Sequence, residues 1–233
     1  MTRLLLVAAS LALIVGCQDT STSVSNLPFG GKSIRLGGMP FTQGSGLLAV
    51  EDRPAGTFTG INASTGIEVI ATVSDDTSVQ VEADDNLIPL ITTEVIDDVL
   101  HVKVVGSLST KNPIKVILKT RELTRVVATS GARIEASKLN GETWKVTVNS
   151  GASVIARGSV ASQTVDASSG ASYQAKELET DTTTVDASSG ASVTVSVLNR
   201  FVGSVASGAR VKYSGKPEHV TTSSSSGGLI SRE

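Results

Sequence analysis

The sequence predicts an all-β fold, a parallel β-helix with coils of about 19 residues and a more irregular N-terminal β part. Three observations lead to this prediction. A Ser-Gly-Ala tripeptide recurs at nearly constant spacing, apolar and polar residues alternate on both sides of it, and aromatic residues make up only 3% of the chain. A core built from Val, Ile, Ala and Leu suits a narrow, repetitive β architecture better than a wide sandwich.

The Ser-Gly-Ala tripeptide predicts a corner at which each coil turns. A glycine can adopt the positive φ that a sharp turn requires, and alanine is small enough for the inside of a narrow corner. The repeat is too short for two helices, so we expect one β-helix coil per repeat, with equivalent residues stacked about 4.8 Å apart. The glycines of the five copies are Gly131, Gly151, Gly170, Gly190 and Gly208, which are 20, 19, 20 and 18 residues apart.

Apolar residues lie at odd distances from each glycine, and mostly polar residues lie at even distances. This period of two is typical of a strand with one buried face. We therefore expect the odd positions to fill the core and the even positions to face solvent. Three residues before the glycines stand Ala128, Val148, Ala167, Ala187 and Val205, and three residues after them stand Ile134, Val154, Tyr173, Val193 and Val211.

The N-terminal half of the domain lacks the tripeptide and has longer strand candidates. Short acidic runs separate these candidates and indicate turns, because Asp and Asn favour turn conformations. Since the ends of a solenoid usually need a cover, we expect irregular early coils or a small capping sheet here. The expected strands are 67–73, 79–83, 91–95, 100–105 and 114–119, and the expected turns are Asp75-Asp76, Asp84-Asp85-Asn86 and Asp97-Asp98.

The first residues predict a bacterial lipoprotein signal. Arg3 supplies a short positive region, and residues 4–15 are apolar apart from Ser10. This length suits a signal peptide and is too short to span a bilayer. The run from Leu13 to Cys17 resembles the bacterial lipobox. That resemblance implies cleavage before Cys17, the only cysteine, and lipid attachment to it, so the mature protein would be anchored to a lipid bilayer.

Four segments follow from these patterns: a signal peptide over 1–16, a lipidated flexible tether over 17–48, a β-helix domain over 49–220 and a Ser/Gly-rich tail over 221–233. We expect the tail to be disordered, with a short terminal strand as the alternative. The tether and the tail are predicted from their content of Ser, Thr and Gly. The residue after the cysteine is Gln rather than Asp, which favours the outer membrane over retention at the inner membrane.

Four features occur along the chain in a fixed order: Phe58-Thr59-Gly60-Ile61-Asn62, then residues 79–87, then Val99-Leu100-His101-Val102, then the Ser-Gly-Ala series. Together they resemble the putative autotransporter adhesin family with a head GIN domain, over about residues 56–215. The resemblance implies a right-handed β-helix in an exported, often lipid-anchored protein. It supplies no catalytic residues.

Asp166 and Asp186 are the candidate metal ligands. They occupy the same position in adjacent repeats, and two carboxylates about 5 Å apart in water repel each other by roughly 1 kcal/mol. A bound Ca²⁺ would relieve that repulsion. Two solvated carboxylates are the interpretation that we favour, because the neighbouring positions hold only Thr147 and Ser204. We therefore expect no metal and no cofactor.

The charge of the chain and the residues expected on its outer surface bear on whether it binds nucleic acid, acts as an adhesin or scaffold, or is an enzyme. A sequence pI near 5.8 argues against a nucleic-acid partner. Stacked Ser, Thr and Asn would form a flat polar surface for a glycan or an envelope protein, so we expect an adhesin or scaffold rather than an enzyme. The alternative is a carbohydrate-active β-helix protein. Arg133 and Arg210 share an outward row for it, but about 14 Å would separate them, which is too far for one catalytic site.

Overall fold

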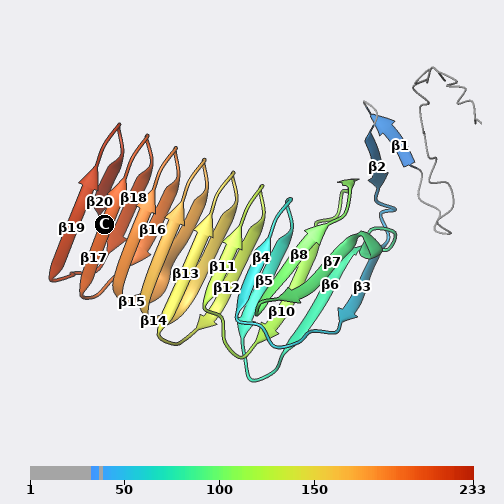
Figure 1. Cartoon of the computed structure of the whole chain (residues 1–233), viewed down its shortest axis with the longest axis horizontal. Helices are drawn as coiled ribbons and strands as arrows, with labels where there is room; N and C mark the ends of the chain where they lie inside the picture. The colour runs from blue at the N-terminus through green and yellow to red at the C-terminus, as the bar shows by residue number, and fades with distance from the viewer. Residues whose placement is uncertain (1–32, 37–38) are drawn as a thin grey trace, which may run out of the picture.

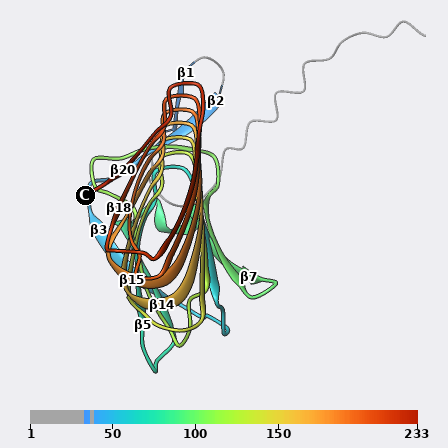
Figure 2. The ribbon, with the colours of Figure 1, turned by 90° about the vertical axis from the view of Figure 1, so that its left-hand side faces the viewer.

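The computed structural model describes residues 33–36 and 39–233, and in it the chain forms the expected stack of β-helix coils. The coils lie side by side along the longest axis, with the irregular N-terminal strands at one end and the C-terminus at the other (Figure 1). Viewed along the stack, the coils superpose as a flattened ring (Figure 2). The predicted signal peptide and Cys17 lie outside the described residues.

Two sheet faces form the wall of the stack, and a separate small sheet projects from it. The first face holds, in spatial order, β7 (Ile91–Ile96), β8 (Val99–Val104), β4 (Gly60–Ala63), β11 (Arg125–Ala128), β13 (Thr143–Val148), the second half of β14 (Ser153–Ala167), the second half of β15 (Ser172–Ala187), β17 (Arg200–Val205) and β19 (His219–Ser224). The second face holds β3 (Leu48–Arg53), β6 (Ser78–Asp84), β10 (Lys115–Thr120), β5 (Glu68–Val73), β12 (Arg133–Leu139), the first halves of β14 and β15, β16 (Ser192–Ser196), β18 (Arg210–Ser214) and β20 (Leu229–Arg232). The small sheet holds β1 (Ser33–Leu36), β2 (Met39–Gln43) and β9 (Ser107–Ser109).

The Ser-Gly corners stack directly on one another and confirm the predicted turn. Both residues of each corner have a positive φ, for example 54° at Ser169 and 71° at Gly170. The glycine N–H of each corner donates to the serine carbonyl of the next coil, so the chain turns without leaving these backbone groups unpaired. Six such bonds, each 3.0 or 3.1 Å long, join the corners at residues 65–66, 130–131, 150–151, 169–170, 189–190, 207–208 and 226–227.

The predicted alternation of buried and exposed residues is confirmed. All ten apolar residues three positions before and after the five tripeptide glycines are buried. Their burial in successive coils forms one continuous core that also reaches the N-terminal strands. Because equivalent strands pair in parallel and in register, each core position meets its counterpart in the coils before and after it.

A chain of buried polar side chains crosses the middle of this core. Trp144 Nε1 donates to the Tyr173 hydroxyl, which donates to Gln163 Oε1, with 3.0 Å for each bond. Gln163 Nε2 in turn donates to the hydroxyls of Thr180 and Thr183. Burial raises the pKa of the Tyr173 hydroxyl well above its usual value, so it remains a neutral donor. Each polar group therefore has a partner, which avoids the cost of an unpaired buried group.

The N-terminal end of the stack is closed by a cap, as predicted. The strands β3, β6 and β7 pair in antiparallel fashion instead of continuing the coils. The 3-10 turn η1 (Ile88–Leu90) follows β6, and Leu87 and Ile88 are buried there. The order of the first coils in space differs from their order in the sequence. The coil of β4 and β5 lies in the middle, with β8 and β10 on one side of it and β11 and β12 on the other. After β10 the chain therefore passes back over the coil of β4 and β5 to start the repeated coils. All five strands predicted for this part exist, each end within one residue of its predicted position.

The favoured prediction of a disordered tail over 221–233 is wrong, and the alternative of a terminal strand is closer to the structure. Strand β19 pairs in parallel with β17, and β20 pairs in parallel with β18, so the segment forms a further coil. The sequence contains a degenerate corner here, in which Gly228 replaces the alanine of Ser-Gly-Ala. Its inward positions hold Thr222 and Ser224, which pair with Gly203 and Val205 of β17, and both are exposed. This coil adds little to the apolar core, and its order comes from backbone pairing with the preceding coil.

The prediction of a flexible tether over 17–48 is wrong for its described C-terminal part. Strand β2 pairs in parallel with β9, and the Gly44 N–H donates to the Ser109 carbonyl over 2.8 Å. The Ser45 N–H donates to the Asn86 side chain over 2.9 Å. These bonds attach the segment to the domain. Residues 17–32 and 37–38 lie outside the described residues.

Candidate functional site

The structure places Asp166 and Asp186 in register on β14 and β15, and both side chains are exposed. Thr147 and Ser204 occupy the same row on either side of them, as predicted. Among the residues that the structure describes, no group of three or more His, Cys, Asp or Glu side chains is placed to hold a metal ion. Calcium binding by this pair therefore has only two carboxylates to support it.

Arg133 and Arg210 are farther apart than predicted. Their row runs through Ser153, Ser172 and Ser192, which makes four strand spacings and about 19 Å instead of 14 Å. Three coils lie between the two arginines, and these make four spacings from one arginine to the other, not three. The two guanidinium groups therefore do not meet in one site.

A cleft of about 540 Å³ lies where the row of corners ends at the N-terminal side. The next coil in that direction, formed by β8 and β10, has no Ser-Gly corner. Its chain instead runs through β9, which pairs with β2 in the separate small sheet, and returns to the stack at β10. The space beside the corner of Thr65 and Gly66 is left open. The lining residues are Thr65, Gly66, Val104, Gly106, Ser107, Leu108, Thr110, Lys111, Asn112, Pro113 and Ile114.

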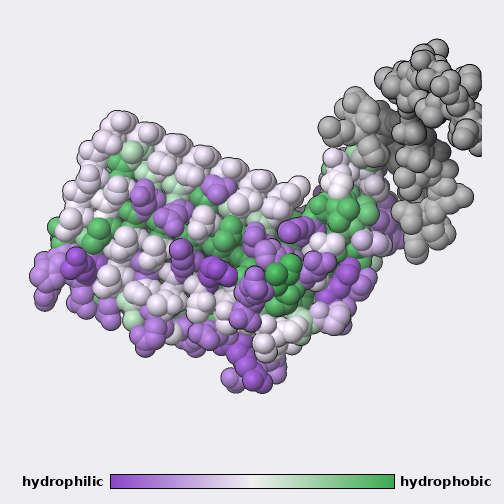
Figure 3. Space-filling view, in the orientation of Figure 1, coloured by the Kyte–Doolittle hydropathy of each residue, from purple (hydrophilic) through white to green (hydrophobic). Residues whose placement is uncertain are grey.

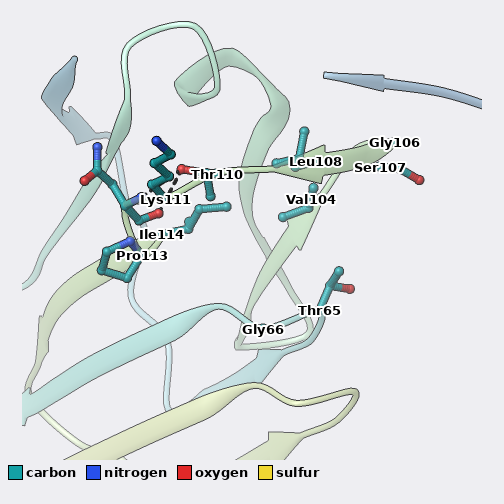
Figure 4. A pocket seen from close by; sticks show the side chains of 11 residues that line it. Thr65, Gly66, Val104, Gly106, Ser107, Leu108, Thr110, Lys111, Pro113 and Ile114 are labelled. Atoms are coloured by element: carbon teal, nitrogen blue, oxygen red, sulfur yellow. Dashed lines mark hydrogen bonds between the residues drawn. The ribbon is translucent and has the colours of Figure 1, made fainter. Parts of the chain in front are cut away.

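The cleft combines an aliphatic lining with polar groups at its margin. Val104 and Leu108 are half-buried, and Ile114 is buried. Figure 4 shows Val104 and Leu108 above the corner that carries Thr65, with the loop that carries Lys111 to their left. Lys111 is an exposed residue of the lining, so its charge is accessible to a ligand. Clefts with an apolar lining and a few placed polar groups are the usual form of a binding site.

Asp84, at the end of β6, fixes the loop that carries Lys111. Its carboxylate accepts hydrogen bonds from Asn112 Nδ2 over 2.6 Å and Thr110 Oγ1 over 2.8 Å, the two residues that flank the lysine. Burial by itself raises the pKa of this carboxyl. The hydrogen bonds from Asn112, Thr110 and the Gly46 N–H outweigh burial and lower the pKa below its usual value. The side chain therefore carries its charge at neutral pH although only 1% of its residue surface is exposed.

The sequence-based assignment of Asp84 to a turn is wrong, since the turn begins at Asp85. Close contact with Gly44 explains why a glycine is needed on the other side of the carboxylate. A Cβ atom at Gly44 would lie 1.8 Å from Asp84 Oδ2. The sequence around Asp84 does not predict that it holds the loop of Lys111, because its hydrogen-bond partners are far from it in the sequence.

Solved structures with the same fold cover nearly the whole domain. A putative adhesin from Bacteroides fragilis superposes with a TM-score of 0.67 at 18% identity, over 82% of this chain and 99% of that one. A putative adhesin from Parabacteroides merdae gives 0.56 at 14% identity, over 83% and 99%. A putative lipid binding protein from Parabacteroides distasonis gives 0.51 at 15% identity, over 82% and 99%. Among curated proteins, none matches this chain.

The solved structures share less than 20% identity with this chain, so they show its fold but not its family. A family model identifies the family. The model described as "Putative auto-transporter adhesin, head GIN domain" matches residues 57–217. The match spans the cleft, all five Ser-Gly-Ala corners and the cap apart from β3. It also confirms the family resemblance seen in the motifs between residues 56 and 215. The chain therefore belongs to the putative auto-transporter adhesin family with a head GIN domain.

Proposed function

We propose that this protein is a lipid-anchored protein of the cell envelope whose β-helix serves as an adhesion or scaffold module. The family match carries this proposal, because it covers nearly the whole β-helix. The geometry supports it, since a stack of coils paired by backbone hydrogen bonds is a stiff rod that holds its outward rows in fixed positions. The partners that fit are a glycan or another envelope protein.

The anchor is the first part of the proposal. Support comes from the sequence alone, namely the apolar run over residues 4–15 and the lipobox ending at Cys17. In the described part of the chain, no helix has the length and apolar character needed to cross a bilayer. The proposed location is the outer membrane, at its periplasmic face or at the cell surface.

The polar outward rows are the second part of the proposal. The corner serines follow one edge of the stack, and Figure 3 shows this edge as a continuous strip of residues with near-neutral hydropathy. Thr129, Asn149, Ser168 and Ser188 stand beside this edge in successive coils. Hydroxyl and amide groups at a regular spacing of about 4.8 Å offer a ligand many equivalent hydrogen bonds.

The anchor is tested by following lipid attachment in a bacterial host. The full chain and a Ser10→Ala control should both incorporate labelled palmitate and fractionate with membranes, whereas Cys17→Ser should do neither. If Cys17→Ser still carried the label or sedimented with membranes to the same extent, the anchoring proposal would be abandoned.

Adhesion is tested with the full chain in detergent on a glycan array and in pulldowns with isolated cell walls, with and without Ca²⁺. Saturable binding to one class of glycan or to cell-wall material is the expected result. Absence of binding to every glycan and wall preparation would replace the adhesin role with a structural role in the envelope.

A further inference from the structure

We propose that the cleft at the N-terminal end of the corner row binds an extended peptide segment of a partner protein. The inference rests on the proposed function as a surface binding module and names the chemical class of its partner. Four features of the cleft carry it: an unpaired carbonyl, an unpaired strand edge, aliphatic residues in the lining and an exposed lysine on a loop that hydrogen bonds fix.

The unpaired carbonyl belongs to Thr65. In the row of corners, each serine carbonyl points toward the preceding coil and accepts the glycine N–H there, as Ser130 does from Gly66 over 3.1 Å. Thr65 holds the serine position of the first corner, so its carbonyl points toward the cleft. No backbone N–H of the described residues donates to it. The N–H of a bound peptide would supply the donor that the missing corner does not.

The unpaired strand edge belongs to β9. The Ser109 carbonyl accepts the Gly44 N–H and therefore points toward β2. Because successive residues of a strand direct their N–H and C=O groups to opposite sides, those of Leu108 point away from β2. Strand β9 is the outer strand of its three-stranded sheet. An extended peptide can add to such an edge through main-chain hydrogen bonds.

The lining of the cleft favours a peptide over a glycan. Val104, Leu108 and Ile114 offer only aliphatic contact, and no aromatic ring lines the cleft on which a sugar ring could stack. Sugar hydroxyl groups buried against these side chains would lose hydrogen bonds to water without replacement. A Val, Ile or Leu side chain of a peptide would instead gain by leaving water.

Lys111 adds a preference for acidic residues. Its two neighbours are hydrogen-bonded to the buried Asp84 carboxylate, so the backbone that carries the lysine is held in place before a ligand arrives. Lys111 forms no ion pair with the residues that the structure describes. The preferred segment therefore combines an aliphatic residue for the lining with an Asp or Glu for the lysine.

The test selects binders from a phage-displayed library of random linear heptapeptides with the full chain immobilised in detergent. We expect the selected peptides to be rich in aliphatic and acidic residues. One selected peptide, synthesised with a fluorescein label, is then titrated by fluorescence anisotropy. Leu108→Asp and Lys111→Glu should each weaken its binding at least tenfold. The matched controls should leave the affinity unchanged. Ile230→Asp changes a partly buried aliphatic residue at the other end of the stack, and Lys145→Glu changes an exposed lysine outside the cleft.

Backbone recognition is tested separately by N-methylating the same peptide at its aliphatic residue, which should also weaken binding at least tenfold. Selection of no peptide, or equal affinity for wild type, Leu108→Asp and Lys111→Glu, would overturn the inference. Lys111→Glu lies at an exposed position, so its result does not depend on a folding defect. Glycan or cell-wall binding that persists when peptide binding fails would leave the proposed function standing and remove only this inference.

Discussion

The Ser-Gly-Ala coils and the N-terminal cap satisfy their backbone groups by different means. In residues 125–232, each coil pairs in parallel with its neighbours, and one corner hydrogen bond is repeated from coil to coil. In residues 40–124, antiparallel pairs, a 3-10 turn and a buried carboxylate close the stack. The repeated part uses the same small residues at every corner, and the hydrogen bonds from Trp144 to Gln163 are an exception that occurs once. The cap depends on side chains that are used once.

This difference predicts how damage spreads. A change inside the repeated part disturbs a core that runs through every coil, so the whole stack should lose stability. A change at the Asp84 cluster should loosen the cap and the cleft while the distant coils keep their protection. Urea unfolding measures the first kind of effect, and amide hydrogen exchange locates the second.

The largest loss is expected for Trp144→Ala, because Trp144 is fully buried in the repeated part. Removing a buried indole should lower the free energy of unfolding by about 4 kcal/mol. Tyr173→Phe keeps the ring but leaves Trp144 Nε1 without its acceptor, and it should cost about 2 kcal/mol. A loss below 1 kcal/mol for Trp144→Ala in urea unfolding would show that the core does not act as one unit.

Two glycines give the next largest contrast. Gly158 has a φ of 139°, and a Cβ atom there would lie 2.2 Å from the Leu139 carbonyl oxygen. Gly158→Ala should therefore cost about 3 kcal/mol. Gly170 has a φ of 71° with open space around it, so Gly170→Ala carries only the backbone strain, about 1 kcal/mol. Thermal unfolding of the two variants should rank them in this order, and equal losses would contradict the structure.

Asp84→Asn should cost about 2 kcal/mol at neutral pH, because an amide cannot accept both hydrogen bonds. The folded-state pKa of Asp84 lies below its unfolded value of 3.8. The stabilisation is therefore complete above about pH 4 and is lost as the pH falls through the folded-state pKa. Hydrogen exchange should increase near residues 44–46 and 110–112 and remain slow in β15. The control Asp76→Asn lies in an exposed turn and should change neither the stability nor the exchange rates. An increase in exchange throughout the protein for Asp84→Asn would argue against a local role of Asp84.

The smallest effect is expected for the double variant Asp166→Ala and Asp186→Ala. Removing two exposed carboxylates that repel each other should raise stability by less than about 1 kcal/mol. Ca²⁺ should shift the unfolding temperature of neither protein. A calcium-dependent increase in the wild type that the variant lacks would instead identify a cation site on this row.

The repeated part could be predicted from sequence because each coil encodes its own corner and its own alternation. Five strands of the N-terminal part were also predicted from local patterns, whereas β3 and β9 were not. The antiparallel pairing in the cap and the return of the chain to β11 were not predictable, since both depend on contacts between distant segments. The last coil was missed because Thr222 and Ser224 break the apolar pattern while the backbone still pairs.

The candidate site was hidden from sequence reasoning for a related reason. The cleft exists because the coil of β8 and β10 lacks a Ser-Gly corner. The absence of a corner is not marked by any sequence motif, so the cleft could not be predicted. Asp84 gathers its partners from residues 44–46 and 110–112, so its role depends on the folded cap rather than on its neighbours. The Asp166 and Asp186 pair was predictable, since register within a repeat follows from the spacing of the glycines.

The coil of the stack is also a unit of length. Residues 164–172 and 184–192 have the same sequence, and their strands lie one spacing of about 4.8 Å apart. Duplicating such a coil by recombination would lengthen the rod by that step and alter neither the cap nor the polar last coil. A β-helix of this kind can therefore gain length in regular increments while the cleft stays at the same end.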